Sequence, residues 1–385
     1  MASADVVIIG AGIVGSSVAY HLTQAGCKNV LVLERESQQG KGSTGKSMGG
    51  VRAQFSTEPS IRMSLYSILF FREFEDRMEH PSGYRGQGYL FVATKESHLN
   101  YLRANFQLQT SLGLKTVELL KPEDVSRMVP QLHSDDIIGG SFCSTDGFVD
   151  PHSVMTGFML RAMDGGAKLV RNAEVTAIER DETGISGVRT ASDRIATRIV
   201  VNAAGAWAGL VAKLAGFELP VQPLRRMLVP TEPFEKIAHT APMTVDMATG
   251  FHFRPEGLGL LMAWNDPTET PGFRTDFDPA FVEKILTRGV SRVPCLEDVE
   301  VNPKRAWAGL YEMTPDHHPI LGAVPGIRGL FLANGFSGHG VMHSPATGKI
   351  VSDLVLKGTS DLVDTRLLDY ERFAEGRLLE ETAVL

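Results

Sequence analysis

The first thirty-four residues carry a strand pattern, then a helix pattern, then a second strand pattern. The run Asp5–Gly10 (DVVIIG) is β-branched and apolar up to its glycine, which is typical of a strand buried in a parallel sheet. A helix of apolar and small residues is expected up to about Ala25, and Gly26 is placed to end it in a left-handed cap. A second apolar run, Asn29–Glu34, predicts the next strand. The pattern therefore predicts a strand–helix–strand unit.

Three glycines follow the first strand with the spacing GxGxxG. Gly10 permits the tight turn, Gly12 lets the backbone approach a pyrophosphate, and Gly15 lets the helix pack closely on the strand. The helix N-terminus directs unpaired N–H groups and positive dipole at the phosphates. Glu34 ends the second strand, where a carboxylate can bind both ribose hydroxyls and repels the 2′-phosphate of NADP. The unit predicts a dinucleotide site and leaves FAD and NAD open.

A loop of small and hydroxyl residues follows the second strand. Residues 40–52 read GKGSTGKSMGGVR and hold little that packs into a core. Such a loop suits a cofactor with a second bulky half, because its ribityl chain and phosphates need backbone and hydroxyl donors. A flexible surface loop is the alternative on composition alone.

Two later segments have the pattern of further strands of the same sheet. Residues 199–207 (IVVNAAGAW) end in small residues, where the chain could pass close to a ligand. Residues 329–335 (GLFLANG) predict another strand, followed by FSGHGVM and a helix through Leu356. A glycine-rich turn at a helix start favours negative charge, which reduced flavin develops at its N1–C2 carbonyl edge.

Composition and charge narrow the possible partners. The 385 residues exceed one core of typical size, so two domains are expected. A net charge of -7 argues against nucleic acid or an anionic membrane, since both need a basic face, and no apolar run is long enough to span a bilayer. The three cysteines lack CxxC spacing, and no targeting signal precedes Asp5. We expect a cytoplasmic protein without a disulfide framework or a metal site.

Six ordered motifs resemble one family. They are the N-terminal fingerprint, STGKSMGGVRAQF, DGFVDP at Asp146–Pro151, VVNAAGAW, TPDHHPILG from Thr314 and GFSGHGV from Gly335. Together they resemble the FAD-dependent D-amino-acid oxidase and sarcosine oxidase (DAO) family, particularly its glycine oxidase, proline dehydrogenase β and dimethylglycine dehydrogenase branch. The resemblance covers nearly the whole chain. It implies an FAD enzyme that passes a hydride from the carbon next to nitrogen of a small secondary or tertiary amino acid to flavin N5.

The resemblance also implies a fold of class α/β plus α+β. A discontinuous Rossmann-like FAD-binding domain would hold residues 1–84, 142–220 and 318–385. Residues 85–141 and 221–317 would form a substrate domain on an antiparallel sheet that roofs the flavin ring. Helices are expected around 100–115 and 121–128.

A hairpin is expected in the second insertion, with strands at 251–254 and 258–264 and a turn at Pro255-Glu256-Gly257. Alternation puts Phe251 and Phe253 on one face and His252 and Arg254 on the other. The sequence leaves open which face lines the pocket.

An amino-acid substrate needs a cation for its carboxylate, and a bidentate arginine serves best. Arg52 is the leading candidate, because the resemblance places a substrate-binding arginine of sarcosine oxidases there. An exposed arginine or a phosphate contact is the alternative. Arg254 is the second candidate, and His252 is the histidine most suited to touch substrate.

The expected FAD contacts lie in the glycine-rich segments and the strand ends. They are Gly10, Gly12, Ile13, Val14, Gly15, Glu34, Arg35, Ser43, Thr44, Ser47, Met48, Gly49, Val51, Val175, Ala203, Ala204, Gly205, Trp207, Gly335, Gly338, His339, Gly340, Val341 and Met342.

Departures from sarcosine oxidases refine the expectation. Residues 308–311 (AGLY) lack the cysteine that tethers FAD in monomeric members, and Lys46 and its neighbours replace a tethering histidine, so the FAD should be non-covalent. Met342 stands in place of a carboxylate-binding lysine, and residues 259–262 (GLLM) lack the oxygen-activating lysine. This favours a dehydrogenase that passes electrons to a carrier or partner subunit over an oxidase that uses oxygen.

Two other functions fit the same motifs. The substrate could be a 2-hydroxy acid, because Arg52 would bind either carboxylate. The chain could also be a flavin-bearing subunit or assembly factor with little activity of its own.

Overall fold

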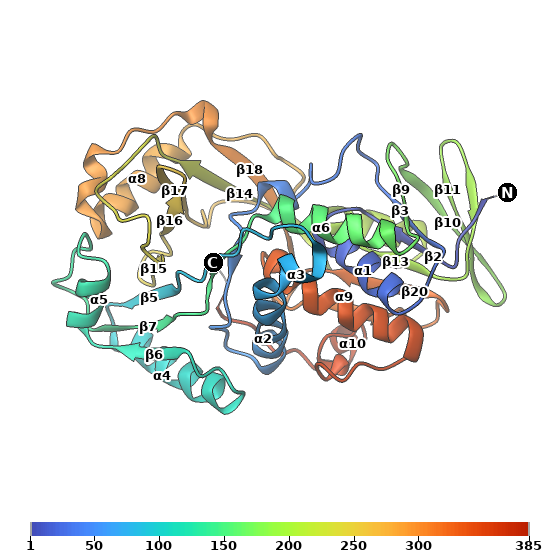
Figure 1. The fold of residues 1–385 in the computed structure, drawn as a ribbon, viewed down its shortest axis with the longest axis horizontal. Helices are drawn as coiled ribbons and strands as arrows, with labels where there is room; N and C mark the ends of the chain where they lie inside the picture. Colours follow the sequence, from blue (N-terminus) through green and yellow to red (C-terminus); the bar gives the residue numbers. More distant parts are fainter. Residues whose placement is uncertain (1, 384–385) are drawn as a thin grey trace.

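The computed structural model describes residues 2–383 and shows two lobes, each built around a sheet (Figure 1). The first lobe holds a six-stranded sheet in the order β19-β20-β13-β2-β3-β9. Its strands are β2 (Val6–Ile9), β3 (Val30–Leu33), β9 (Lys168–Val170), β13 (Val200–Asn202), β19 (Ile320–Ala323) and β20 (Leu330–Asn334). All neighbours run parallel except β19, which lies antiparallel at the edge. The expected strand–helix–strand unit, with α1 at Ile13–Gln24, is therefore central to this sheet.

Other elements cover both faces of the six-stranded sheet. Its central strand β2 is therefore apolar at every position. On one face Val6 and Ile8 join a core with α1, α2 (Glu58–Arg72), α6 (Pro151–Asp164) and α9 (Gly340–Lys357). On the other face Val7 and Ile9 join a core with α7 (Ala208–Leu214) and a four-stranded sheet. The strands of that sheet are β1 (Ala2–Ser3), β10 (Val175–Asp181), β11 (Gly184–Thr190) and β12 (Arg194–Ala196).

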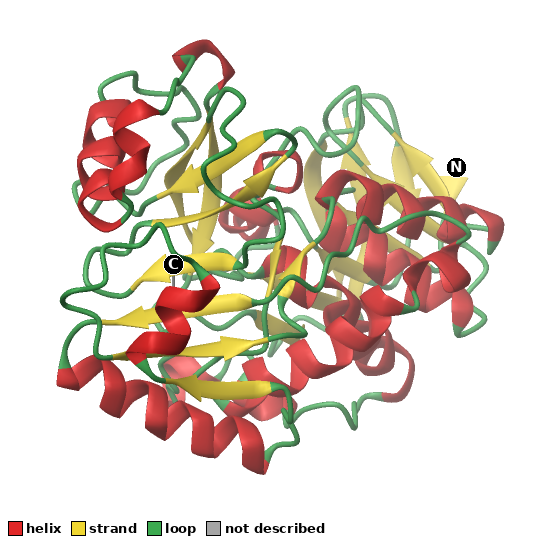
Figure 2. Ribbon diagram, turned by 60° about the vertical axis from the view of Figure 1, so that its left-hand side comes forward, coloured by secondary structure: helices red, strands yellow, loops and turns green. Residues whose placement is uncertain are grey.

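The second lobe holds an eight-stranded sheet, which we call the roof sheet, in the order β18-β14-β17-β16-β15-β5-β7-β6. Figure 2 shows it beside the first lobe with helices at its margins. The strands are β5 (Tyr89–Ala93), β6 (Val117–Leu120), β7 (Gly139–Cys143), β14 (Gln222–Pro230), β15 (Met243–Asp246), β16 (His252–Glu256), β17 (Gly259–Ala263) and β18 (Trp307–Met313). The helices are α4 (Glu96–Ser111), α5 (Pro122–Met128) and α8 (Phe281–Arg292).

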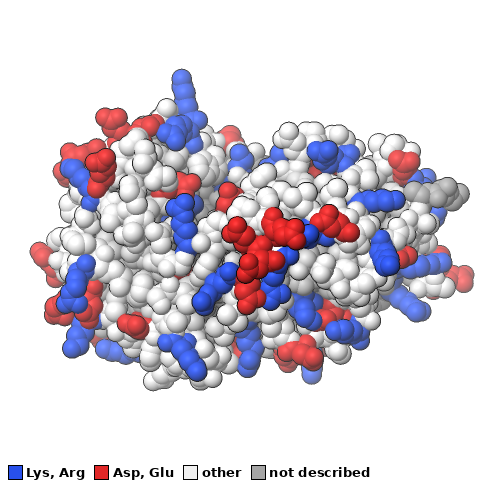
Figure 3. Space-filling model, in the orientation of Figure 1, with Lys and Arg blue, Asp and Glu red and all other residues white. Residues whose placement is uncertain are grey.

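The remaining elements are short. They are α3 (Phe74–Met78), α10 (Arg372–Glu375), the two-stranded β4 (Gly50–Val51) and β8 (Gly147–Phe148), and 3-10 turns at Thr44–Lys46, Gly205–Trp207, Pro294–Asp298, Pro303–Arg305 and Thr365–Leu367. Within residues 2–383, every helix is too short or too polar to cross a bilayer. On the face drawn in Figure 3, acidic and basic side chains are interspersed.

The expected class, α/β plus α+β, is confirmed by these parallel and antiparallel sheets. The two insertions meet in the roof sheet, where β5 and β15 pair in parallel while the other neighbours pair antiparallel. The domain boundaries remain a prediction.

The hairpin turn is shorter than expected and begins two residues later. Glu256 pairs with Gly259, and Pro255 pairs with Leu260 inside the ladder, so the turn consists of Gly257 and Leu258. A two-residue turn needs positive φ, and Gly257 supplies it with φ 56°.

Candidate cofactor and substrate cavity

A cavity of about 420 Å³ opens where the six-stranded sheet faces the roof sheet. Its floor is made by the residues that follow the carboxyl ends of β2, β3 and β13, which is where parallel sheets bind ligands. Its roof is made by β14, β16, β17 and β18.

The glycine turn of the floor is shaped by close backbone approaches. Gly10 has φ 103°, and a Cβ there would lie 2.5 Å from the carbonyl oxygen of Ala203. A Cβ on Gly15 would lie 2.0 Å from the carbonyl oxygen of Gly10, so Gly15 serves packing and does not line the cavity. Gly12 lines the cavity at the N-terminus of α1 and leaves the approach open.

Two side chains hold this turn against the neighbouring segments. The Glu34 carboxylate accepts hydrogen bonds from the backbone N–H of Ala11 at 3.0 Å and of Glu36 at 3.0 Å. The Thr44 hydroxyl accepts one from the N–H of Ile13 at 3.0 Å. Glu34 lines the cavity beside Arg35, whose guanidinium stacks on Trp207 at 3.8 Å.

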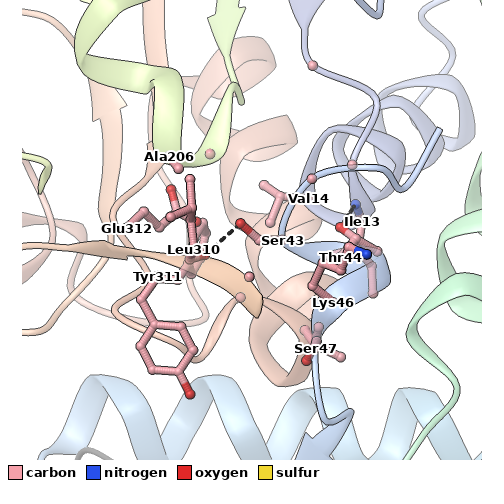
Figure 4. Close-up of a pocket in the computed structure, with 18 of the residues that line it drawn as sticks. Ile13, Val14, Ser43, Thr44, Lys46, Ser47, Ala206, Leu310, Tyr311 and Glu312 are labelled. Carbon is pink, nitrogen blue, oxygen red and sulfur yellow. Dashed lines mark hydrogen bonds between the residues drawn. The ribbon is translucent and has the colours of Figure 1, made fainter. Parts of the chain in front are cut away.

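The loop expected to hold the second half of the cofactor runs between floor and roof. Figure 4 shows Ser43 donating to the carbonyl oxygen of Leu310 on β18, at 2.7 Å, with Thr44 beside Ile13. The Ser47 hydroxyl accepts from the N–H of Gly49 at 3.1 Å. The loop is therefore bonded to both lobes and is not a free surface loop.

Sheet register shows which face of the hairpin meets the cavity. Phe251 and Phe253 pack into a core with α8, whereas His252 lines the cavity. His252 lies across from Ala263 of β17, which lies across from Leu228 of β14, and all three line the cavity. The roof near His252 is therefore largely apolar.

His252 is a neutral imidazole. Burial lowers its pKa to about 4, despite a hydrogen bond between Nδ1 and the carbonyl oxygen of Gly250 at 3.0 Å. Because a carbonyl only accepts, Nδ1 carries the proton and Nε2 is left as an acceptor.

Arg52 lines the cavity, and its guanidinium is already hydrogen-bonded within the chain. Its guanidinium donates to the carbonyl oxygen of Gln54 at 2.6 Å, to Nε2 of His339 at 3.2 Å and to the carbonyl oxygen of Ala383. It also stacks on Phe55 at 3.9 Å and is 1% exposed. Three acceptors from this chain occupy the group that we expected to bind substrate.

Arg254 does not line the cavity. It shares a face with His252, but its Nε donates to the carbonyl oxygen of Met48 at 2.9 Å, and its Nη1 pairs with Glu256. Its guanidinium lies over Phe148 at 4.6 Å. The Arg254 side chain therefore holds the loop of residues 40–52 in place and does not face the ligand.

The structure brings most of the expected cofactor residues to one cavity. Those that line it are Gly10, Gly12, Ile13, Val14, Glu34, Arg35, Ser43, Thr44, Ser47, Met48, Val175, Ala203, Ala204, Gly205, Trp207, Gly338, His339, Gly340, Val341 and Met342. Those that do not are Gly15, Gly49, Val51 and Gly335, which pack against backbone or core atoms instead.

Several cavity residues were not anticipated. Tyr311 packs its ring against Gly338, where a Cβ would lie 2.4 Å from the ring, and Figure 4 shows it projecting from β18. Glu312 accepts from the N–H of Gly335 at 2.9 Å, and burial raises its pKa to about 7. Arg226 enters from β14. Tyr311 is the last residue of the AGLY segment, and no local pattern there indicates that its ring enters the cavity.

These residues fit FAD. The glycine turn after β2 leaves room for a pyrophosphate. The loop of residues 40–52 and the turn at 338–342 line the same cavity and could hold the rest of the cofactor. The family model for FAD-dependent oxidoreductases, DAO, matches residues 5–354.

Known proteins resemble the chain over its whole length. FAD-dependent oxidoreductase domain-containing protein 1 of Xenopus laevis is 31% identical, over 99% of this chain and 85% of its own. Human mitochondrial sarcosine dehydrogenase is 28% identical over 96% of this chain, which spans only 41% of that protein. The crystal structure of L-proline dehydrogenase from P. horikoshii superimposes with a TM-score of 0.91 at 30% identity, covering 98% of this chain and all of the other.

Proposed function

The chain belongs to the DAO family of FAD-dependent oxidoreductases, and on that premise we propose that it oxidises a small secondary or tertiary amino acid. It would remove a hydride from the carbon next to nitrogen and pass it to flavin N5. The observation that carries this proposal is the cavity itself, which joins a dinucleotide floor to arginine side chains under an apolar roof. The sarcosine and proline dehydrogenases that resemble the chain support the substrate class.

FAD would be held by the floor and the loop. Gly10 and Gly12 would leave room for the pyrophosphate, Glu34 would bind ribose, and Ser43 and Thr44 would line the path to the second half. Bound FAD supplies the hydride acceptor. We propose non-covalent binding, because Cys27, Cys143 and Cys295 are all absent from the cavity lining and Lys46 stands where histidine-tethered members carry that histidine.

The residues of the chain would then position the substrate and exclude water. Leu228 and Ala263 present apolar surface, so a substrate beneath them would be desolvated. His252 would accept a hydrogen bond from a substrate N–H at Nε2, since it is neutral and its Nδ1 is engaged. The amine would be oxidised in its neutral form, so the ammonium of the bound amino acid would first lose its proton to solvent, and the hydride would then pass to the bound cofactor.

The acceptor of the electrons would be oxygen or a carrier, including a partner subunit. We also propose a cytoplasmic location, on the basis of three free, separated cysteines.

Anaerobic bleaching of the flavin absorbance tests the function. The purified holoenzyme would be mixed with N-methyl amino acids, proline, D-amino acids and 2-hydroxy acids. We expect fast bleaching by one amine class, and admitting air then separates oxidase from dehydrogenase. Bleaching by hydroxy acids alone would overturn the amine proposal. A bound flavin that nothing bleaches would favour a subunit or assembly role.

A further inference from the structure

Arg226 is a cation that faces the cavity without an anionic partner among residues 2–383. It lies on β14 opposite Gly309 of β18 and lines the cavity with Leu228, two residues along the same strand. Its Nη1 donates to the carbonyl oxygen of Arg225 at 3.2 Å, and its Nε is buried without an acceptor. Burial lowers its pKa, yet a guanidinium stays charged. Partly buried charges are normally paired. The Arg226 guanidinium is therefore suited to bind an anionic ligand that enters the cavity.

The neighbouring Arg225 shows what a satisfied arginine looks like on the same strand. Its guanidinium binds both oxygens of Glu269, at 2.6 and 3.1 Å, and also Asp276 at 3.2 Å. It is absent from the cavity lining, because alternation points it to the opposite side of β14. Arg225 is therefore neutralised by carboxylates of the protein, whereas Arg226 faces the cavity.

Arg52 is less suited to a substrate carboxylate than Arg226. Gln54, His339 and Ala383 already accept from its guanidinium, and Phe55 covers its face. A bidentate carboxylate needs two parallel N–H groups free at once. Arg226 donates to a single acceptor and keeps most of its N–H groups for a ligand.

We propose that Arg226 binds the carboxylate of the substrate, in place of Arg52, and this inference rests on the proposed function. Tyr311 lies between Arg226 and the glycine-rich turn: its ring centre is 5.2 Å from the Arg226 guanidinium carbon, and its edge packs on Gly338. The substrate class is thereby narrowed to small amino acids with a free carboxylate. Their esters and amides would lose the charged contact.

Carboxylate binding tests the assignment without turnover. Propionate would be titrated into the holoenzyme and its Kd taken from the change in flavin absorbance, with propionamide as the neutral probe. We expect propionate to bind and propionamide to bind at least about 10-fold more weakly. Arg226→Gln should weaken propionate about 10- to 100-fold, since hydrogen bonds to charged groups are lost. Arg226→Lys should retain part of the affinity, and guanidinium ion should restore part of it to Arg226→Ala.

Arg225→Gln is the matched control. It should lower thermal stability and leave the Kd for propionate unchanged. If it yields no holoenzyme, Arg274→Gln, at an exposed arginine that also pairs with Glu269, replaces it. The proposal is overturned if Arg226→Gln keeps the wild-type Kd, or if it weakens propionate and propionamide by the same factor. Because propionate is not oxidised, these outcomes are independent of whether any amine bleaches the flavin.

Discussion

Arg52 donates a hydrogen bond to Nε2 of His339 at 3.2 Å, which couples the loop after β3 to the glycine-rich turn before α9. A guanidinium has no acceptor, so Nε2 must carry a lone pair and the ring must be neutral. Burial and the Arg52 charge both hold the pKa of His339 well below its usual range. The histidine between the two glycines of GHG is thus a fixed acceptor and not a proton carrier.

Replacing Arg52 should weaken the fold as well as the site. Arg52→Gln would leave the acceptors on Gln54, His339 and Ala383 short of donors, the first two of them on buried residues and the third half-buried. Each unsatisfied buried group costs about 1–3 kcal/mol, so we expect at least that loss in the free energy of unfolding. Urea denaturation of wild type and variant measures it. An unchanged midpoint would show that the three bonds contribute little.

Gly338 should be required for the turn. Gly338→Ala places a Cβ 2.4 Å from the Tyr311 ring at φ 100°, so the turn must shift and FAD affinity should fall about 10-fold or more. Fluorescence titration of apoprotein with FAD measures the affinity. Gly358→Ala is the control, because Gly358 also has positive φ, at 78°, and a Cβ there meets no atom within 4 Å. Equal loss of affinity in both variants would contradict the steric argument.

Glu312 should make stability depend on pH near neutrality. Burial raises its pKa from 4.5 to about 7, so the folded state binds a proton more tightly than the unfolded state. The stability that it contributes is complete below pH 4.5 and is lost as pH rises towards 7, by about 3 kcal/mol. In Glu312→Gln the amide oxygen can still accept from Gly335, and this loss should disappear.

Urea denaturation of wild type and Glu312→Gln between pH 4.5 and 8 isolates this group, since other titrating residues are common to both. Parallel profiles would contradict the assignment.

Glu381 should anchor the segment that covers Arg52. Its buried carboxylate accepts from the hydroxyls of Ser56 and Thr57 and from the N–H of Ser56. Although burial alone would raise its pKa, these hydrogen bonds hold it below the usual range, so the stabilisation is present above pH 4.5 and lost on further acidification. Glu381→Gln should speed tryptic cleavage after Arg377 at neutral pH, as followed by mass spectrometry.

Glu380→Gln is the matched control, because Glu380 is the exposed neighbour of Glu381. Cleavage that is equally fast in both variants would mean that the segment is held by other contacts.

The dinucleotide floor was predictable because its constraints are local. A strand, three glycines, a helix and a terminal acid lie within thirty-four residues, and a Cβ on Gly15 would meet the carbonyl oxygen of Gly10 in the same turn. The exception is Gly10, whose Cβ would meet the carbonyl oxygen of Ala203. The roof was not predictable to the same degree. Arg225 and Arg226 look equivalent in sequence, and only the register of β14 against β18 decides which one enters the cavity. Likewise Phe251 and His252 are both buried, so burial alone could not distinguish core from cavity.

The hydrogen bonds that engage the Arg52 guanidinium join residues that are still further apart in the sequence. Its acceptors include His339 and Ala383, separated from it by most of the chain. No local sequence pattern predicts a contact over such a separation. The sequence therefore placed Arg52 at the site, but it could not show that the guanidinium N–H groups already donate to acceptors within the chain.

The parallel pairing of β5 with β15 has a consequence for biosynthesis. Tyr89 finds its partner Met243 roughly 150 residues later, so β5, β6 and β7 leave the ribosome long before the strand that completes their sheet. Until then β5 presents an unpaired edge whose apolar side chains have no covering lobe. Nascent chains arrested between residues 143 and 243 should therefore bind holdase chaperones and aggregate when released, whereas released full-length chains should not.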